Sequence, residues 1–348
     1  MKKLTALAGA LLILILLQAV LMPKYLGRQR EGGLIREYYA QAGGHDVIFV
    51  GDCEVYENIS PITLWREQGI PAYIRGSPQQ TVWQSYYLME ETLRYETPKV
   101  MVYNVLALKY DTPQSTGNQR YREAYNRMCL DGMRWSDSKW KSIQASLTRE
   151  EKQWGGALTY VFPILRFHDR WQDLSPDDFR YAFRQEAVTD CGYLMQTEVR
   201  PITDDYVSAP VASYRLGDNS WYYLDKMARL CQEKGVELVL IKSSALYPVW
   251  WWEWDEQVAA WAEERGIRYL NLIPHEAEIG IDWNTDTYDG GFHLNVTGAE
   301  KEASYLGAWL RENCGLPDRR EDEVYAALWA EKTAAYDARK EALTAASS

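Results

Sequence analysis

The residues best suited to chemistry are a cysteine on a turn and, far along the chain, a histidine with an acidic neighbour. Cys53 follows Gly51 and Asp52 at the end of an apolar run, and His293 follows Asp289 by four residues. A thiolate can attack a carbonyl carbon, an imidazole can take and return the proton, and a carboxylate can hold the imidazole tautomer. These are the groups that acyl transfer needs, so we expect Cys53, His293 and Asp289 to be catalytic.

Acyl transfer also needs hydrogen-bond donors for the developing oxyanion. Gly76 closes a second apolar run and Asn104 lies late in a third. Ligands of open α/β sheets bind beyond the carboxyl ends of the strands, where these residues would meet. We expect the N–H groups of Cys53 and Gly76 and the Asn104 amide to form the oxyanion hole. Structural roles stay open as alternatives: a buried thiol, a turn glycine and a strand-end cap.

The aromatic composition suggests a further binding surface. The 348 residues include 15 Trp and 25 Tyr but only 6 Phe, and rings with a polar group suit sugar-binding clefts. Trp250 and Trp251 follow an apolar run and are therefore expected on the side of the candidate site. We predict that they bind substrate by stacking on sugar faces. Burial and a rim at a membrane surface are the alternatives.

Composition and motifs exclude several other classes. The net charge of -11 leaves no basic surplus for nucleic acid. The five cysteines contain no C-x-x-C pair, and the chain has no metal-ligand cluster or phosphate loop, so we expect no metal and no cofactor. Outside the cytosol cysteines tend to pair, and an odd number leaves at least one thiol free.

Apolar runs alternate with amphipathic stretches, a rhythm that predicts a parallel sheet with helices on both faces. The expected strands are 46–53, 72–76, 99–108, 236–242 and 267–273. A short helix begins at Ser60 and Pro61, and longer helices are expected over 80–95, 221–234, 254–265 and 297–313. The rhythm breaks between the third and fourth strands.

These patterns divide the chain into four parts. Residues 1–23 form an N-terminal transmembrane anchor, 24–44 a linker, 45–316 an α/β domain with a mostly helical insertion at 111–217, and 317–348 a solvated C-terminal helix. The insertion is expected over one end of the sheet, or as a separate domain. The uncharged run from Leu4 to Met22 nearly spans a bilayer core and lacks a small-x-small cleavage site. With Lys2 and Lys3 before it, we place the main domain outside the cell.

The constellation resembles the SGNH (GDSL-type) hydrolases. The likeness rests on Val50-Gly51-Asp52-Cys53 in place of Gly-Asp-Ser, on Gly76 and Asn104, and on Asp289 with His293-Leu294-Asn295. It covers roughly residues 46–111 and 218–313 and is nearest to the membrane-anchored bacterial branch of the D-alanine transfer protein DltD and the alginate O-acetylation proteins. It implies a three-layer α/β/α flavodoxin-like fold that hydrolyses or transfers acyl esters. The implied partners are a cell-envelope polysaccharide or other acylated glycan and a membrane-bound O-acyltransferase.

Two departures from the family pattern leave alternatives. Cysteine replaces the family's serine, which is compatible with a thioester but also with a silent relative. The family spacing is D-x-x-H, so either Gly290 or Gly291 is an extra residue that restores the geometry, or Asp286 is the triad acid. The rival function is a non-catalytic envelope protein that binds a polymer or scaffolds an acyltransferase. A redox thiol is a weaker alternative, because Cys53 has no resolving cysteine nearby in the sequence.

Overall fold

The core of the molecule is a five-stranded parallel sheet. The computed structural model describes residues 2–185, 187–203, 211–246 and 250–347. The strand order is β2-β1-β3-β4-β5, the flavodoxin-like order, and all four pairings are parallel. The strands are β1 (Val47–Gly51), β2 (Ala72–Gly76), β3 (Val100–Asn104), β4 (Glu237–Lys242) and β5 (Arg268–Asn271). The predicted fold class is confirmed.

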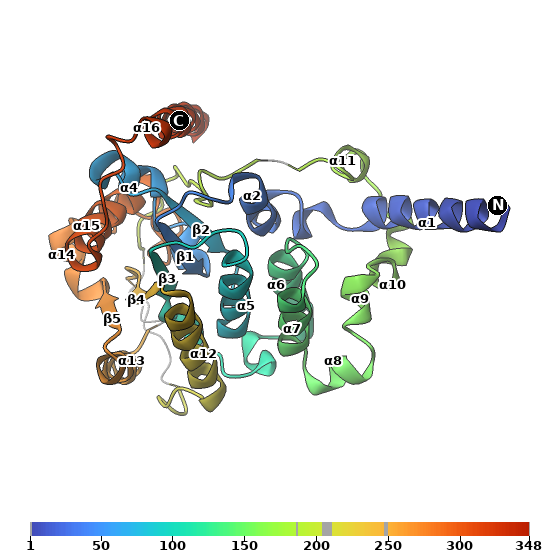
Figure 1. Cartoon of the computed structure of the whole chain (residues 1–348), viewed down its shortest axis with the longest axis horizontal. Helices are drawn as coiled ribbons and strands as arrows, with labels where there is room; N and C mark the ends of the chain where they lie inside the picture. The colour runs from blue at the N-terminus through green and yellow to red at the C-terminus, as the bar shows by residue number, and fades with distance from the viewer. Residues whose placement is uncertain (1, 186, 204–210, 247–249, 348) are drawn as a thin grey trace.

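Helices cover both faces of the sheet, as Figure 1 shows. One layer holds α5 (Val82–Thr92), α12 (Asp218–Lys234) and α13 (Trp252–Arg265), and the other holds α4 (Pro61–Gln68) and α15 (Val296–Cys314). Every residue of β1, β2 and β3 is buried between these layers. Burial on both faces explains why these strands read as continuous apolar runs.

Capping residues fix the ends of the helices beside the candidate site. At the start of α4, the Ser60 hydroxyl accepts a hydrogen bond from the N–H of Thr63 at 3.2 Å, and Pro61 takes the first helical position. At the start of α15, the Asn295 side chain accepts hydrogen bonds from the second and third N–H groups of the helix. The residues just before α15 are therefore held at the carboxyl edge of the sheet.

The third strand is shorter than the sequence indicates. β3 ends at Asn104, and the chain continues as the 3-10 helix η3 (Val105–Lys109) rather than as strand to residue 108. The side-chain oxygen of Asn104 accepts the N–H of Ser243, so the amide interacts beyond the end of the neighbouring strand. Val105 and Leu108 are buried, so their apolar character serves the core rather than a strand.

The insertion forms a second helical body beside α5. It contains η4 (Pro113–Thr116), α6 (Gln119–Leu130), α7 (Asp137–Ser146), α8 (Arg149–Gln153), α9 (Leu158–Val161), α10 (Ile164–Phe167), η5 (His168–Gln172) and α11 (Pro176–Arg180). Within its described residues there is no strand, only an isolated bridge between Asp190 and Tyr193. A small apolar cluster that includes Leu88, Leu130 and Ile143 joins α6 and α7 to α5.

The last part of the insertion returns to the sheet. The carbonyl of Cys191 accepts a hydrogen bond from Ile74 in the edge strand β2. Leu194 then donates its backbone N–H to Tyr56, and Arg200 donates to Thr287 in the loop that precedes α15. This part of the insertion borders the carboxyl edge of the sheet, whereas its helices lie to one side.

The linker and the C-terminal helix are packed on the body. The linker forms η1 (Lys24–Leu26), η2 (Arg30–Gly33) and α2 (Leu34–Gln41), and α2 packs against β2. The remaining short helices are α3 (Cys53–Tyr56), η6 (Ile273–His275) and α14 (Glu276–Ile279). The C-terminal helix α16 (Glu323–Ser347) buries Trp329, which stacks on Trp65 of α4, and Tyr336. It is thus more firmly attached than the expected solvated helix.

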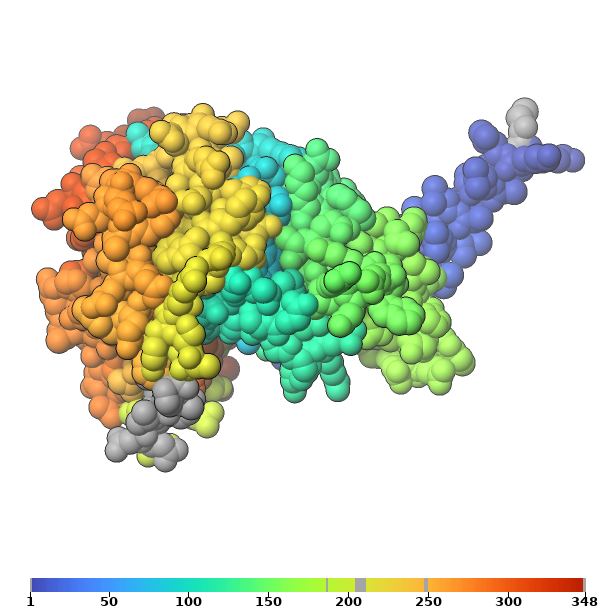
Figure 2. Space-filling view, turned by 90° about the horizontal axis from the view of Figure 1, so that it is seen from below, coloured from blue at the N-terminus to red at the C-terminus, as the bar shows by residue number. Residues whose placement is uncertain are grey.

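The N-terminal helix α1 (Lys2–Leu21) projects from the body beside the insertion, as Figure 2 shows. Among the described residues it is the helix long and apolar enough to cross a membrane. Most of its side chains are exposed, and burial begins at Leu21.

Candidate active site

The first part of the site is the turn that follows β1. The chain passes from Gly51 directly into the short helix α3, and the Asp52 carboxylate caps this helix by accepting the N–H of Glu54 at 3.2 Å. A Cβ on Gly51 would lie 2.4 Å from a Val55 methyl group, so the tight turn requires glycine. The turn places Cys53 at the carboxyl edge of the sheet with a half-buried thiol.

The second part is the loop before α15, in which Asp289 binds His293. The imidazole Nδ1 lies 2.7 Å from the Asp289 carboxylate, and the same carboxylate accepts the backbone N–H of His293 at 2.9 Å. Because a carboxylate only accepts, Nδ1 carries the hydrogen and Nε2 is left for another partner. Gly290 and Gly291 have φ of 83° and 101°, and this left-handed pair folds the longer D-x-x-x-H loop back on itself.

The two parts meet at the Cys53 thiol and the His293 imidazole, which lie close enough for each to shift the pKa of the other. Burial raises the pKa of Cys53, while His293 acts in the opposite direction and stabilises the thiolate. Burial alone would lower the pKa of His293, but the negative charge of the thiolate and the Asp289 carboxylate raise it above its ordinary value. The Cys53 thiol therefore lies beside an imidazole that is itself hydrogen-bonded to Asp289.

A second carboxylate, that of Glu57, lies near the same imidazole. Its carboxylate is 3.6 Å from Nδ1 of His293 and is almost fully buried. Burial raises the pKa of Glu57 to about 7, partly offset by His293 and by a hydrogen bond from Tyr288. The ring of Tyr288 also stacks on the imidazole, with 6.1 Å between centroids. The histidine is thus enclosed by two acids and an aromatic ring.

Asp286, the alternative triad acid, is engaged elsewhere. Its carboxylate accepts Lys301 Nζ at 2.6 Å and the backbone N–H of Asp282 at 2.9 Å. Within the described residues it makes no hydrogen bond or ion pair with His293. Of the two candidate acids, Asp289 is the one that is hydrogen-bonded to the imidazole.

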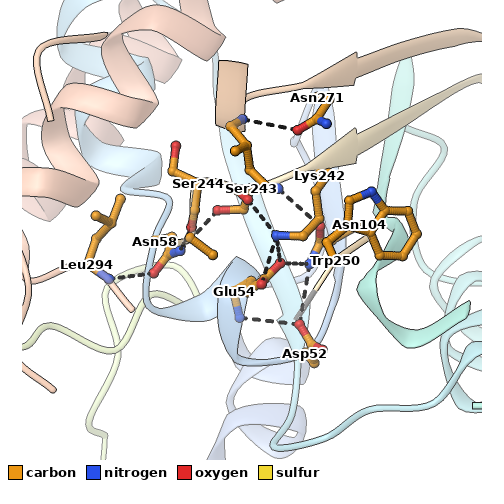
Figure 3. A network of polar contacts seen from close by, with 12 residues as sticks. Asp52, Glu54, Asn58, Asn104, Lys242, Ser243, Ser244, Trp250, Asn271 and Leu294 are labelled. Atoms are coloured by element: carbon orange, nitrogen blue, oxygen red, sulfur yellow. Dashed lines mark hydrogen bonds and ion pairs between the residues drawn. The ribbon is translucent and has the colours of Figure 1, made fainter. Parts of the chain in front are cut away.

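Asn104 belongs to a buried polar network that includes Asp52 and Glu54, the residues on either side of Cys53, and Figure 3 shows this network. Its amide nitrogen donates to Asp52 at 3.3 Å and to Glu54 at 2.9 Å. Lys242, fully buried at the end of β4, donates to both Glu54 oxygens at 2.9 Å. In this arrangement the Asn104 donors face carboxylates, which differs from the expected oxyanion hole.

A second branch of the network reaches the histidine loop. The Asn58 amide nitrogen donates to the Ser243 hydroxyl at 3.0 Å and to the carbonyl of Ser244 at 3.2 Å. Its oxygen accepts the N–H of Leu294, the residue after His293, at 2.9 Å. The buried carboxyl of Glu302 accepts the Ser243 hydroxyl and the Ser244 N–H. Burial raises the pKa of Glu302 to about 7.

Gly76, the other expected oxyanion donor, lies opposite Gly51 in the β1–β2 pairing and is buried. A Cβ there would be 3.1 Å from the Tyr56 ring and 3.3 Å from the Gly51 carbonyl oxygen. The structure therefore places Gly76 next to the Cys53 turn, with little space for a side chain.

The expected sugar platform does not form at Trp250. This residue is only 5% exposed, packs against Trp254, and donates its indole N–H to Asp255. Its ring faces are therefore covered by protein. Trp251 is half-buried and makes an edge contact with Tyr214. Trp250 therefore has the alternative role, that of a buried side chain.

All five cysteines lie in the described part of the chain and are unpaired there. Cys53 is the one beside an imidazole. Across the described residues no group of three or more His, Cys, Asp or Glu side chains is arranged to hold a metal ion.

Sequence reasoning missed Glu57, Asn58 and Lys242. Glu57 is four residues after Cys53 and Asn58 is five, so the pattern C-x-x-x-E-N carried a spacing signal of about one helical turn. Lys242 is a charged residue at the end of an apolar strand, and this position places it at the carboxyl edge of the sheet. Its burial depends on Glu54, which lies 188 positions earlier.

Comparisons with known proteins give a distant likeness in structure. No protein-family model matches the chain, and no curated protein sequence matches it. A crystal structure from Bacteroides fragilis, described as a “putative acylhydrolase”, is similar at a TM-score of 0.38 and 11% identity, with 82% of this chain and 99% of that chain covered.

Proposed function

We propose that this protein is a membrane-anchored SGNH-type enzyme that hydrolyses or transfers acyl esters on cell-envelope carbohydrate. The observation that carries the proposal is the hydrogen bond between His293 and Asp289, with the Cys53 thiol beside the same imidazole. Cys53 is the nucleophile, His293 the general base and acid, and Asp289 the residue that orients the imidazole. The anchor is α1, with the body on the extracytoplasmic side. An acylated glycan and a membrane-bound O-acyltransferase are the proposed partners.

The proposed reaction has two steps. The imidazole takes the thiol proton, the thiolate attacks the acyl carbon, and the alcohol leaves with that proton, so a thioester forms on Cys53. Water or a sugar hydroxyl then attacks the thioester while His293 takes its proton, and the returned proton restores the thiol. The N–H groups of Cys53 and Gly76 are the proposed oxyanion donors. Asn104 can join them only if its amide leaves Asp52 or Glu54.

The electrostatics of the thiol favour a second candidate, a non-catalytic scaffold with the same fold. Burial raises the pKa of Cys53, and the charges of Asp52 and Glu57 raise it further. The Asn104 donors are also occupied. In this alternative the cleft binds a polymer or docks on an acyltransferase without forming a thioester.

Hydrolysis of a small aryl acetate by the full-length chain in detergent micelles separates the two functions. We expect turnover in the wild type and in Cys53→Ser, and none in Cys53→Ala, with an acetyl group trapped on the Cys53 peptide of the wild type. Cys231→Ala is the matched control, because Cys231 is a buried thiol on α12, outside the site. Equal activity in all variants, or no activity and no acetyl adduct in any, would favour the scaffold.

A further inference from the structure

The N-terminal helix is fixed to the insertion at the point where it meets the body. Arg170 donates to the carbonyl of Leu21 at 2.6 Å, and Lys24 donates to the carbonyl of Val20 at 3.0 Å. Both cations also contact Asp178, at 3.0 Å and 3.5 Å. These bonds satisfy carbonyl groups that the end of a helix leaves open. The last turn of α1 and the insertion are therefore one structural unit.

The length of α1 decides where this unit lies relative to a bilayer. At 1.5 Å per residue, its 20 residues extend about 30 Å, which is about the thickness of a bilayer core. The end of α1 already packs against α10, η5 and α11. If α1 spans the bilayer, these elements have to lie at the boundary between acyl chains and headgroups.

The same three elements carry large apolar side chains that are mostly exposed. Leu165 on α10 is 55% exposed, Trp171 on η5 is 66% exposed, and Phe179 on α11 is 61% exposed. Figure 1 shows α9 and α10 on one side of α1 and α11 on the other, at the end of the body from which α1 projects. Elements that carry exposed apolar residues thus lie on two sides of the base of the anchor.

We infer that α10, η5 and α11 form a membrane-docking surface, in which Leu165, Trp171 and Phe179 enter the lipid interface around α1. The inference rests on the proposal that α1 is a membrane anchor. Tryptophan is favoured at bilayer interfaces because one part of its ring system is apolar and its N–H is polar. Partial insertion of these residues adds apolar burial beside the anchor and fixes the orientation of the body on the membrane.

The test uses the full-length chain reconstituted in vesicles of phosphatidylcholine and phosphatidylglycerol, with and without bromine on the acyl chains. Bromine quenches tryptophan fluorescence on contact. We expect Trp171→Phe to lose at least half of the quenching seen in the wild type. Phe179→Trp should add quenching. Trp252→Phe is the matched control, because Trp252 on α13 is 63% exposed but lies away from α1, and it should quench like the wild type.

Alkaline extraction of the same vesicles separates failure of the anchor from failure of the docking surface. A chain released by carbonate would overturn the anchor and, with it, the inference. A chain that stays in the vesicles but shows unchanged quenching in Trp171→Phe and in Phe179→Trp would overturn the docking surface alone. It would then assign the exposed apolar residues to a protein partner.

Discussion

The side-chain oxygen of Asn58 accepts the backbone N–H of Leu294 at 2.9 Å. Asn58 follows Cys53 by five residues, and Leu294 directly follows His293, so one amide joins the thiol turn to the histidine loop. The nitrogen of the same amide binds Ser243 and Ser244 at the end of β4. The distance between thiol and imidazole is therefore held by a side chain that contacts neither, and both partners are fixed to the sheet.

His293→Ala should slow the alkylation of Cys53. The imidazole lowers the pKa of the thiol against the effect of burial, so its removal raises that pKa and depletes the thiolate. A rise of one pKa unit reduces the rate at pH 7.5 about tenfold. Iodoacetamide labelling followed by peptide mass spectrometry measures this rate. The labelling rate of Cys314, which is half-buried at the end of α15, is measured in the same samples and should not change. An unchanged rate at Cys53 would contradict the pairing.

Asp289→Asn should reduce aryl acetate turnover about 10²–10⁴-fold, because the amide no longer holds the imidazole tautomer or balances its charge. Asp286→Asn is the matched control in the same loop. It loses the contact with Lys301, so its effect falls on stability, while turnover per folded molecule stays close to that of the wild type. Steady-state kinetics with the folded fraction measured by circular dichroism distinguishes them. The opposite ranking of the two variants would assign the orienting role to Asp286.

Lys242→Met should destabilise the fold by about 3–5 kcal/mol, because it leaves the buried Glu54 carboxylate without its cation. Adding Glu54→Gln should recover much of this loss. Arg66→Ala breaks an exposed ion pair with Asp337 and should cost no more than about 1 kcal/mol. Urea unfolding of the four chains measures the differences. If the double variant is as unstable as Lys242→Met, the contact with Glu54 does not stabilise the fold.

Glu302→Gln should change how stability depends on pH. The folded state holds the pKa of Glu302 at about 7, above the ordinary value of 4.5, so the folded chain binds more protons between these pH values. The stabilising contribution is fully present below pH 4.5 and is lost as the pH rises to about 7, at a cost of about 3 kcal/mol. Unfolding curves across this range should show the loss in the wild type and a smaller loss in Glu302→Gln. Glu67→Gln, at an exposed position near the end of α4, should follow the wild type.

The strand pattern could be predicted from the sequence because burial on both faces imposes continuous apolar runs. The expected strand 72–76 matches β2 residue for residue. The expected strand 99–108 failed after Asn104, since η3 is as apolar as a strand and only tertiary contacts separate the two. Periodicity alone does not distinguish short buried segments of different backbone.

The sequence allowed the site to be predicted only where the chemistry follows from residue type. The pairing of Asp289 with His293 follows from their spacing, and the positive φ of Gly290 and Gly291 accommodates the longer loop. The partners of Asn104 were not accessible, because Glu54 and Asp52 compete for its donors in three dimensions. Trp250 was misplaced for a similar reason, since its cover by Trp254 depends on how α13 packs.

The C-terminal helix has a consequence for the order in which the chain can fold. Tyr336 of α16 contacts Ser60, the residue that caps α4, across 276 positions of sequence, and Trp329 stacks on Trp65 of the same helix. During synthesis, α4 emerges well before the helix that covers it. The ring of Trp65 therefore stays open to solvent or to chaperones until α16 has emerged. A nonsense mutation that removes α16 would leave the ring of Trp65 exposed and direct the product to proteolysis.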